Sequence, residues 1–222
     1  MIKALIFDFD GLILDTETPE YEAWRDIYLE FGQDLSLEVW GQVVGGTAAS
    51  DFRPLSHLQS LTGRDLTSLN LSARASERNL ARIIALSPLP GVMAALHTAC
   101  RLGLRLAVAS SSSHHWVDGH LIRLGMAHFF EVIKCADDVP RTKPEPDLYL
   151  SALEALGMSP LEAVAFEDSP NGVTAARRAG IFVVAIPNPV TAQLKIVGEN
   201  LRVNSLAGLS LAKLLGQFNQ GD

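Results

Sequence analysis

The sequence predicts an α/β protein: a Rossmann-like parallel sheet covered by helices, with an all-helical cap inserted after the first strand. From residue 92 onward, short apolar segments alternate with helical patterns, which is typical of parallel strands buried on both faces. Residues 15–87 carry helical patterns and no convincing strand. We therefore expect an α/β catalytic core formed by residues 1–14 and 88–222, and a helical cap domain formed by residues 15–87.

The core elements follow from their apolar patterns. The first strand is expected at Ile2–Phe7, and the later strands at Leu104–Ala109, Phe130–Lys134, Ala163–Phe166, Phe182–Ile186 and, more weakly, Leu201–Val203. Helices are expected between and after them, at Val92–Leu102, His114–Leu124, Asp147–Leu156, Asn171–Ala179 and Leu206–Leu215. In such sheets, ligands bind beyond the carboxyl ends of the strands, so these ends are where a site is expected.

The cap is expected to contain several helices. In the first of them, apolar residues recur at helical spacing after Pro19, which a first helical turn tolerates, and Gly32 is a suitable stop. The expected helices are Glu20–Phe31, Leu37–Val44, Asp51–Leu61 and Leu71–Leu86.

Composition excludes several classes of protein. The net charge of −7 argues against a general binder of nucleic acids or of anionic membranes. No segment resembles a signal peptide or reaches transmembrane length. Cys100 and Cys135 lack metal-ligand spacing, so we expect them to be reduced. A cytoplasmic, monomeric enzyme that acts on a small molecule fits these properties.

Two carboxylates, Asp8 and Asp10, follow the first strand. Their spacing sends both side chains to the same side of an extended backbone, where they repel each other and favour a divalent cation. Gly11 then lets the chain turn sharply. Acidic residues also end strands for purely structural reasons, so this motif alone does not decide the function.

Other chemically active residues follow later strands. Ser110 ends the second strand and begins a run of serines, which can donate hydroxyl and backbone N–H groups to an anion, although serines there also cap helices. Lys143 lies in a loop stiffened by two prolines; a loop lysine is often only solvated, but here its direction is fixed. Glu167 and Asp168 form a second acid pair at a strand end. Together with Asp8 and Asp10, this pair predicts an oxygen-rich Mg²⁺ site. Ser110 and Lys143 are expected to bind a phosphoryl group.

This set of residues resembles the haloacid dehalogenase superfamily over the whole chain. The helical insert is similar to a C1-type cap, and three motifs are similar to those of β-phosphoglucomutase-like phosphatases: Asp-Gly-Leu-Ile-Leu-Asp-Thr-Glu (residues 10–17), Lys-Pro-Glu-Pro-Asp (143–147) and Phe-Glu-Asp-Ser-Pro-Asn-Gly (166–172).

The resemblance implies a role for each residue at the strand ends. Asp8 attacks the substrate phosphorus and becomes an aspartyl phosphate, while Asp10 protonates the leaving oxygen and then activates water. The Asp8 side chain, the Asp10 backbone carbonyl and Asp168 bind Mg²⁺, with Glu167 beside them or coordinating through water. Ser110 donates hydrogen bonds to the phosphoryl oxygens, and Lys143 offsets the repulsion between Asp8 and the phosphate.

Departures from related families narrow the choice of reaction. Asp10 argues against a dehalogenase, because a leaving chloride needs no proton. Residues 15–87 contain no lysine, which argues against a phosphonatase using a cap Schiff base. Where β-phosphoglucomutase has a cap histidine and arginine, this chain has Glu20 and Ala49, with Arg53 nearby. We expect a Mg²⁺-dependent phosphatase of a small phosphorylated metabolite such as a sugar phosphate. A phosphomutase is the first alternative. A receiver-like signalling module is the second, although receivers lack a cap and the second aspartate.

Specificity is expected in the cap, because the core groups contact only the phosphate. Trp24 and His115 are further candidates, but Trp24 fits a helix core and both His114 and His115 fit a helix start. The candidate substrate-binding residues are Gly11, Ser111, Glu20, Gly46, Thr47, Arg53 and His114.

Overall fold

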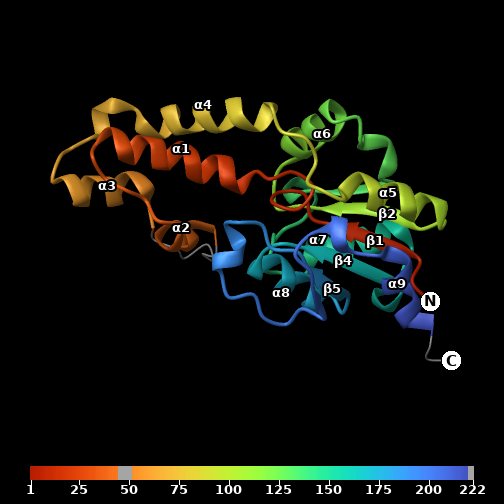
Figure 1. The fold of residues 1–222 in the computed structure, drawn as a ribbon. Helices are drawn as coiled ribbons and strands as arrows, with labels where there is room; N and C mark the ends of the chain where they lie inside the picture. Colours follow the sequence, from red (N-terminus) through yellow and green to blue (C-terminus); the bar gives the residue numbers. More distant parts are fainter. Residues whose placement is uncertain (45–51, 220–222) are drawn as a thin grey trace.

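A computed structural model of the chain describes residues 1–44 and 52–219 (Figure 1). Within this part of the chain, no helix has the length and apolar character needed to cross a membrane.

A six-stranded parallel sheet forms the core. Its strands are β1 (Ala4–Phe7), β2 (Arg105–Ala109), β3 (Val132–Lys134), β4 (Ala163–Glu167), β5 (Phe182–Ala185) and β6 (Leu201–Arg202). They lie in the order β3-β2-β1-β4-β5-β6, and every pairing is parallel. Phe7, the last residue of β1, is in register with Val108 of β2 and Phe166 of β4. The residues that follow these three central strands therefore meet at one edge. The predicted fold class is confirmed.

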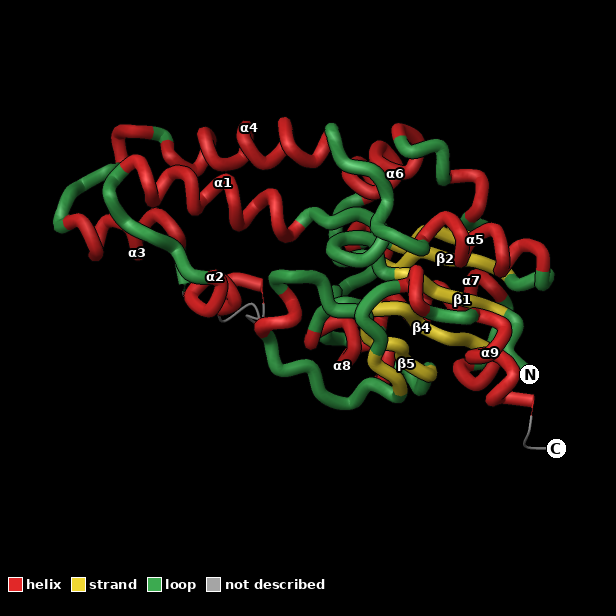
Figure 2. The backbone as a smooth tube through the Cα atoms, in the orientation of Figure 1, coloured by secondary structure: helices red, strands yellow, loops and turns green. Residues whose placement is uncertain are grey.

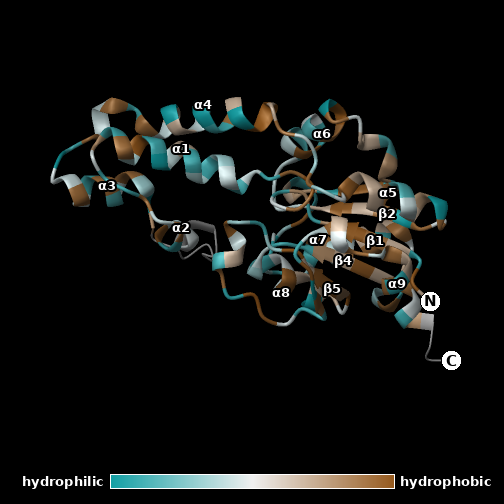
Figure 3. Cartoon of the chain, in the orientation of Figure 1, coloured by the Kyte–Doolittle hydropathy of each residue, from teal (hydrophilic) through white to brown (hydrophobic). Residues whose placement is uncertain are grey.

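Helices cover both faces of the sheet (Figure 2). Leu5 and Phe7 face α5 (Val92–Arg101), α6 (His114–Arg123) and α9 (Leu211–Gly216), whereas Ala4 and Ile6 face α7 (Asp147–Leu156) and α8 (Pro170–Arg178). Alternate strand residues point to opposite faces, so an entirely apolar strand needs this cover on both sides. Figure 3 shows the strands as the hydrophobic centre of this layered arrangement.

The cap lies between β1 and α5 in the chain and extends away from the sheet (Figure 1). It consists of α1 (Glu17–Glu30), α2 (Leu37–Val44), α3 (Pro54–Thr62) and α4 (Leu71–Ile84). Helices α1 and α4 lie side by side, linked by ion pairs from Arg74 and Arg78 to Glu30. The cap has a separate apolar cluster, which includes Trp24 and Trp40, so Trp24 has a packing role. This separate cluster supports the predicted division into core and cap, whose boundaries stay a prediction.

Two chain connections join the core to the cap, and they contact each other. The backbone N–H of Leu89 on the return connection donates to the carbonyl of Ile13 on the outgoing one, at 2.9 Å. Val190, in the loop after β5, packs into the apolar cluster of the cap. The cap is thus held at two places on the edge of the sheet where the strands end.

Several element boundaries differ from the sequence expectation. Helix α1 begins at Glu17, three residues early, because the Asp15 side chain accepts a hydrogen bond from the N–H of Thr18. The closing helix expected at Leu206–Leu215 is divided into a 3₁₀ turn at Leu206–Gly208 and α9, since Ser210 caps a new helix by accepting from the N–H of Lys213. Helix α3 starts at Pro54, and Asp51 lies outside the described residues.

Candidate active site

A cavity of about 390 Å³ lies at the carboxyl ends of the central strands, between the sheet and the cap. Asp8 follows β1, Ser110 follows β2, and Asp168 follows β4. Lys143 arrives from the loop before α7. These four residues, together with Asp10, all line the cavity, so segments that are far apart in the sequence meet there as expected for a parallel sheet.

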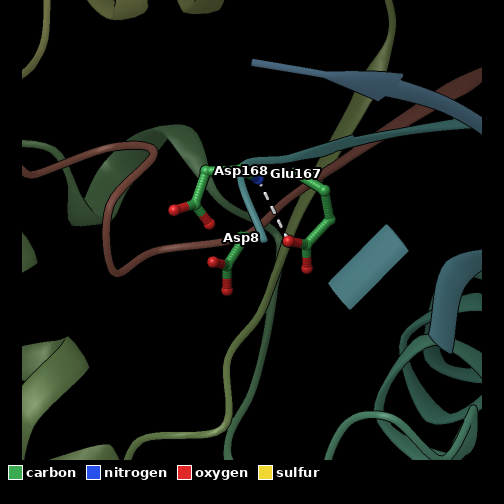
Figure 4. A group of neighbouring side chains, drawn as sticks. All are labelled: Asp8, Glu167 and Asp168. Atoms are coloured by element: carbon green, nitrogen blue, oxygen red, sulfur yellow. Dashed lines mark hydrogen bonds between the residues drawn. The ribbon is translucent and has the colours of Figure 1, made fainter. Parts of the chain in front are cut away.

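Three buried carboxyl groups form the centre of the site. Asp8, Glu167 and Asp168 each offer an oxygen within 4.8 Å of the others, and Figure 4 shows them converging at the strand ends. Burial and the neighbouring Glu167 raise the pKa of Asp8 to about 7. Burial, Asp8 and Glu167 also raise the pKa of Asp168 well above its usual value. This concentration of buried negative charge favours a bound cation.

Lys143 supplies one positive charge to this cluster. Its Nζ lies 2.5 Å from Asp8 Oδ1 and 2.6 Å from Glu167 Oε1, and only 6% of the side chain is exposed. Burial lowers the pKa of Lys143, but the two carboxylates outweigh burial and raise it above the usual lysine value. The lysine therefore stays charged, and it holds Asp8 in place through a short ion pair.

Glu167 is fixed from several sides. Its Oε1 accepts from the Tyr149 hydroxyl at 2.7 Å, in addition to Lys143, and its Oε2 accepts from the backbone N–H of Asp168 at 3.1 Å. Gly172 makes room for it, because a β-carbon at that position would overlap the Glu167 carboxylate. These contacts fix the Glu167 carboxylate, which in turn holds Lys143 in position.

Asp10 lines the cavity, and its carboxylate accepts hydrogen bonds from three side chains. Oδ2 accepts from the Ser112 hydroxyl at 2.6 Å and from the Ser110 hydroxyl at 3.3 Å, while Oδ1 accepts from Trp116 Nε1 at 2.8 Å. Sequence reasoning missed the roles of Ser112 and Trp116. The only available signal was their position in the serine run and in the first turn of the helix after it.

The donor set around Asp8 and Asp168 fits a hard divalent cation, which binds carboxylate oxygens. Asn188 Nδ2 holds Asp168 Oδ2 at 2.8 Å and also donates to the carbonyl of Gly11 at 3.2 Å. Gly11 has a φ of 78°, and a β-carbon there would overlap both Asp168 and Asn188. Gly11 therefore allows close approach of the backbone, and it does not line the cavity, contrary to the expectation of a substrate contact.

The cap side of the cavity has a different composition. Thr16, Glu17 and Glu20 approach from the start of α1, and Asn79 and Ile83 approach from α4. Of these, only Glu20 was predicted. The others lie in positions that gave no local signal, since their approach depends on how α1 and α4 pack together.

The predicted substrate-binding residues divide into three groups. Glu20 and Ser111 line the cavity. Arg53 and His114 are not among the residues that line it, and both ring nitrogens of His114 face carboxylates, Asp118 at 3.0 Å and Asp138 at 2.8 Å. A substrate contact from His114 stays a prediction, and its ring is held by its neighbours at the start of α6. Gly46 and Thr47 lie outside the described residues.

Comparison with known proteins agrees with this geometry. A model of the haloacid dehalogenase-like hydrolase family matches residues 5–186. The chain belongs to this family. A relative from Bacillus subtilis (strain 168), named "Putative phosphatase YhcW", is 49% identical over 219 residues, covering 99% of each chain. The fructose-1-phosphate phosphatase YqaB of Escherichia coli (strain K12) is 31% identical and covers 82% of this chain and 95% of its own.

A solved structure of this family has the same fold. A CbbY variant from Rhodobacter sphaeroides in complex with xylulose-1,5-bisphosphate has a TM-score of 0.73 and 29% identity, covering 96% of this chain and 99% of its own. The predicted family and the predicted enzyme class, a phosphoric monoester hydrolase, are confirmed.

Proposed function

We propose that this haloacid dehalogenase-like hydrolase is a Mg²⁺-dependent phosphatase that hydrolyses a small phosphorylated metabolite, such as a sugar phosphate, through an aspartyl phosphate on Asp8. The observation that carries the proposal is the arrangement of two aspartates at one cavity. Asp8 is paired with Lys143 beside the acid cluster, and Asp10 is aimed into the same cavity by Ser112 and Trp116. A nucleophile and a separate proton carrier are the two groups that this reaction needs.

The cation would be held by the Asp8 side chain, Asp168 and the backbone carbonyl of Asp10, with Glu167 beside them. When bound, it supplies positive charge that offsets the repulsion between the phosphate and Asp8. The buried carboxylates with raised pKa values support this assignment, because their negative charge has only Lys143 to balance it among the described residues that line the cavity.

The residues of the chain then carry out two displacements. An Asp8 oxygen forms a bond to phosphorus, the ester P–O bond breaks, and Asp10 gives its proton to the departing oxygen. Water next attacks the phosphorus of the aspartyl phosphate and gives a proton back to Asp10. Phosphate departs, and the Asp8 carboxylate is restored. Lys143 favours the ionised form of Asp8 before the attack and after phosphate departs, and Ser110 and Ser111 offer hydroxyl groups to the phosphoryl oxygens.

The phosphomutase alternative is less well supported. A mutase binds a bisphosphate, and so needs a second anion site. Among the described residues that line the cavity, the cap contributes no lysine or arginine. The receiver-like alternative is disfavoured by the cap and by Asp10, which would shorten the life of a phosphorylated aspartate. The expected partner is a small phosphorylated metabolite. Cytoplasmic location, a monomeric state and the absence of a nucleic-acid or membrane partner stay predictions.

Phosphate release from a panel of phosphorylated metabolites and from p-nitrophenyl phosphate, with Mg²⁺ and with EDTA, tests the proposal. We expect release by the wild type with Mg²⁺ only. Asp8→Asn keeps the size of the side chain but removes the nucleophile, so we expect it to be inactive while its circular dichroism spectrum is unchanged. A wild type that is inert toward every ester, or an active Asp8→Asn variant, would refute the proposal.

A further inference from the structure

The cap half of the cavity is rich in hydrogen-bond acceptors. Glu17 and Glu20 contribute carboxyl groups from α1, and Asn79 contributes an amide from α4. Thr16, which precedes α1, contributes a hydroxyl. The core half of the cavity, which binds the phosphate in the proposed function, uses none of these four residues.

Two of these groups lack partners. The Thr16 hydroxyl and the Asn79 side-chain oxygen are buried and have no hydrogen-bond partner, and Thr16 is only 6% exposed. Buried polar groups without partners are unfavourable, and such groups in native proteins call for an explanation. Both residues line the cavity, so a ligand with hydroxyl groups would provide the missing hydrogen bonds.

The charge of this half is negative or neutral, but not positive. Among the described residues lining the cavity, Lys143 is the one cation, and it is already bound to Asp8 and Glu167. Burial and the neighbouring Glu20 and Asp10 raise the pKa of Glu17 to about 8. Burial and Asp10 also raise the pKa of Glu20. Negative charge in the cap half is therefore unfavourable, and the binding of a further anion there would be more unfavourable still.

We propose that Glu17, Glu20, Asn79 and Thr16 restrict the substrate to the monophosphate ester of an uncharged polyhydroxylated compound, and that they reject bisphosphates. This inference rests on the proposed function and narrows its substrate class. Hydroxyl groups of the departing alcohol donate to the carboxylates and to the amide oxygen. A second phosphate would instead lie against two carboxyl groups with no lysine or arginine of the cap to balance it among the described residues that line the cavity, and like charges oppose binding. In this respect the chain differs from its structural relative that binds a bisphosphate.

The test measures competition against p-nitrophenyl phosphate hydrolysis in the presence of Mg²⁺. The competitors are two matched pairs: fructose 1-phosphate with fructose 1,6-bisphosphate, and glucose 6-phosphate with glucose 1,6-bisphosphate. Inhibition constants can be measured whether or not a competitor is itself hydrolysed. We expect at least one monophosphate to inhibit about tenfold or more tightly than its bisphosphate counterpart.

Variants identify the residues responsible. Glu20→Gln removes a charge and keeps the size of the side chain, so we expect the preference for the monophosphate to shrink severalfold. Asn79→Leu removes the amide and should weaken the binding of sugar monophosphates, seen as a severalfold rise in their inhibition constants, because their hydroxyl groups lose an acceptor. Glu22→Gln is the matched control, since Glu22 lies on the same helix but outside the cavity, near Arg82.

The outcomes separate the two proposals. If the wild type does not hydrolyse p-nitrophenyl phosphate, the proposed function fails. If it does, but bisphosphates inhibit as tightly as monophosphates or no monophosphate inhibits, the substrate restriction is wrong while the phosphatase stands. An unchanged preference in Glu20→Gln, or an equal change in Glu22→Gln, would also overturn it.

Discussion

The two halves of the cavity differ in how completely their polar groups are paired. On the core side, Asp8, Asp10, Lys143 and Glu167 are all bound to one another or to neighbouring donors. On the cap side, the Thr16 hydroxyl and the Asn79 oxygen have no partner. The core side is therefore arranged before the substrate arrives, as phosphoryl transfer requires, whereas the cap side becomes complete only with a ligand.

The largest expected effect is a loss of activity when Asp10, on the core side of the cavity, is replaced. Asp10→Asn keeps an acceptor for Ser112 but cannot carry the proton, so we expect kcat to fall by about 10²–10⁴-fold. The backbone carbonyl of Asp10 is unchanged, so the Mg²⁺ concentration giving half-maximal activity should move little. Steady-state kinetics with Mg²⁺ titration measures both values.

Trp116→Phe provides the comparison for that variant. It removes one donor to Asp10 and keeps an aromatic ring, although a smaller one, so its loss of kcat should be about tenfold and smaller than that of Asp10→Asn. Turnover that does not change in Asp10→Asn would remove the acid–base role from this residue.

The next largest effect is a loss of stability when Lys143, also on the core side of the cavity, is replaced. Lys143→Met leaves Asp8 and Glu167 buried without their shared cation, so we expect the free energy of unfolding to fall by about 3–5 kcal/mol. Added Mg²⁺ should stabilise this variant more than the wild type, because the carboxylates then depend on it alone. Urea unfolding with and without Mg²⁺ measures both effects.

The exposed pair between Lys3 and Glu162 offers the control for this change. Lys3→Met removes a surface ion pair, and it should destabilise the fold far less than Lys143→Met. Equal losses in Lys143→Met and Lys3→Met would show that the buried charges around Lys143 do not depend on it as described above.

The smallest effect concerns His114, which belongs to neither half. Partial burial lowers its pKa, but hydrogen bonds to Asp138 and Asp118 outweigh burial and raise it above the usual 6.5. The protonated His114 ring therefore stabilises the folded protein fully below about pH 6.5. This stabilisation is lost as the pH rises through the raised pKa of His114. Because His114 is partly exposed, its contribution should stay below about 1 kcal/mol.

His114→Asn should abolish this part of the pH dependence of the melting temperature between pH 6 and 9, with no change in KM. His115→Asn, at the exposed neighbouring position, is the control for general effects of the substitution. A large rise in KM for His114→Asn alone would support the prediction that His114 contacts the substrate.

The same comparison explains how much could be predicted from the sequence. Asp8, Ser110 and Asp168 each follow a short strand, and parallel strands bring such positions to one edge, so local patterns were enough to predict that these residues meet on the core side. Asn79 lies on α4, more than sixty positions after Thr16, and it reaches the cavity only because α4 packs beside α1. No local pattern encodes that approach.

Side chains that support the site were also hidden from the sequence. Tyr149 and Asn188 have ordinary alternative roles in a helix and a loop, and their contacts with Glu167 and Asp168 depend on tertiary packing. The partners of His114 were hidden from the sequence as well. Its place after the serine run suggested substrate binding, but the nearby Asp118 and Asp138 hold its ring.

Identification of the phosphorylated residue tests the central claim most directly. Enzyme mixed with a hydrolysed phosphate ester and Mg²⁺ is quenched during turnover and treated with borohydride, which reduces an aspartyl phosphate to homoserine. Peptide mass spectrometry then locates the change. We predict homoserine at position 8, dependent on both ester and Mg²⁺ and absent in Asp8→Asn. Turnover that continues with no modification at position 8, or with the modification at another carboxylate, would contradict the account.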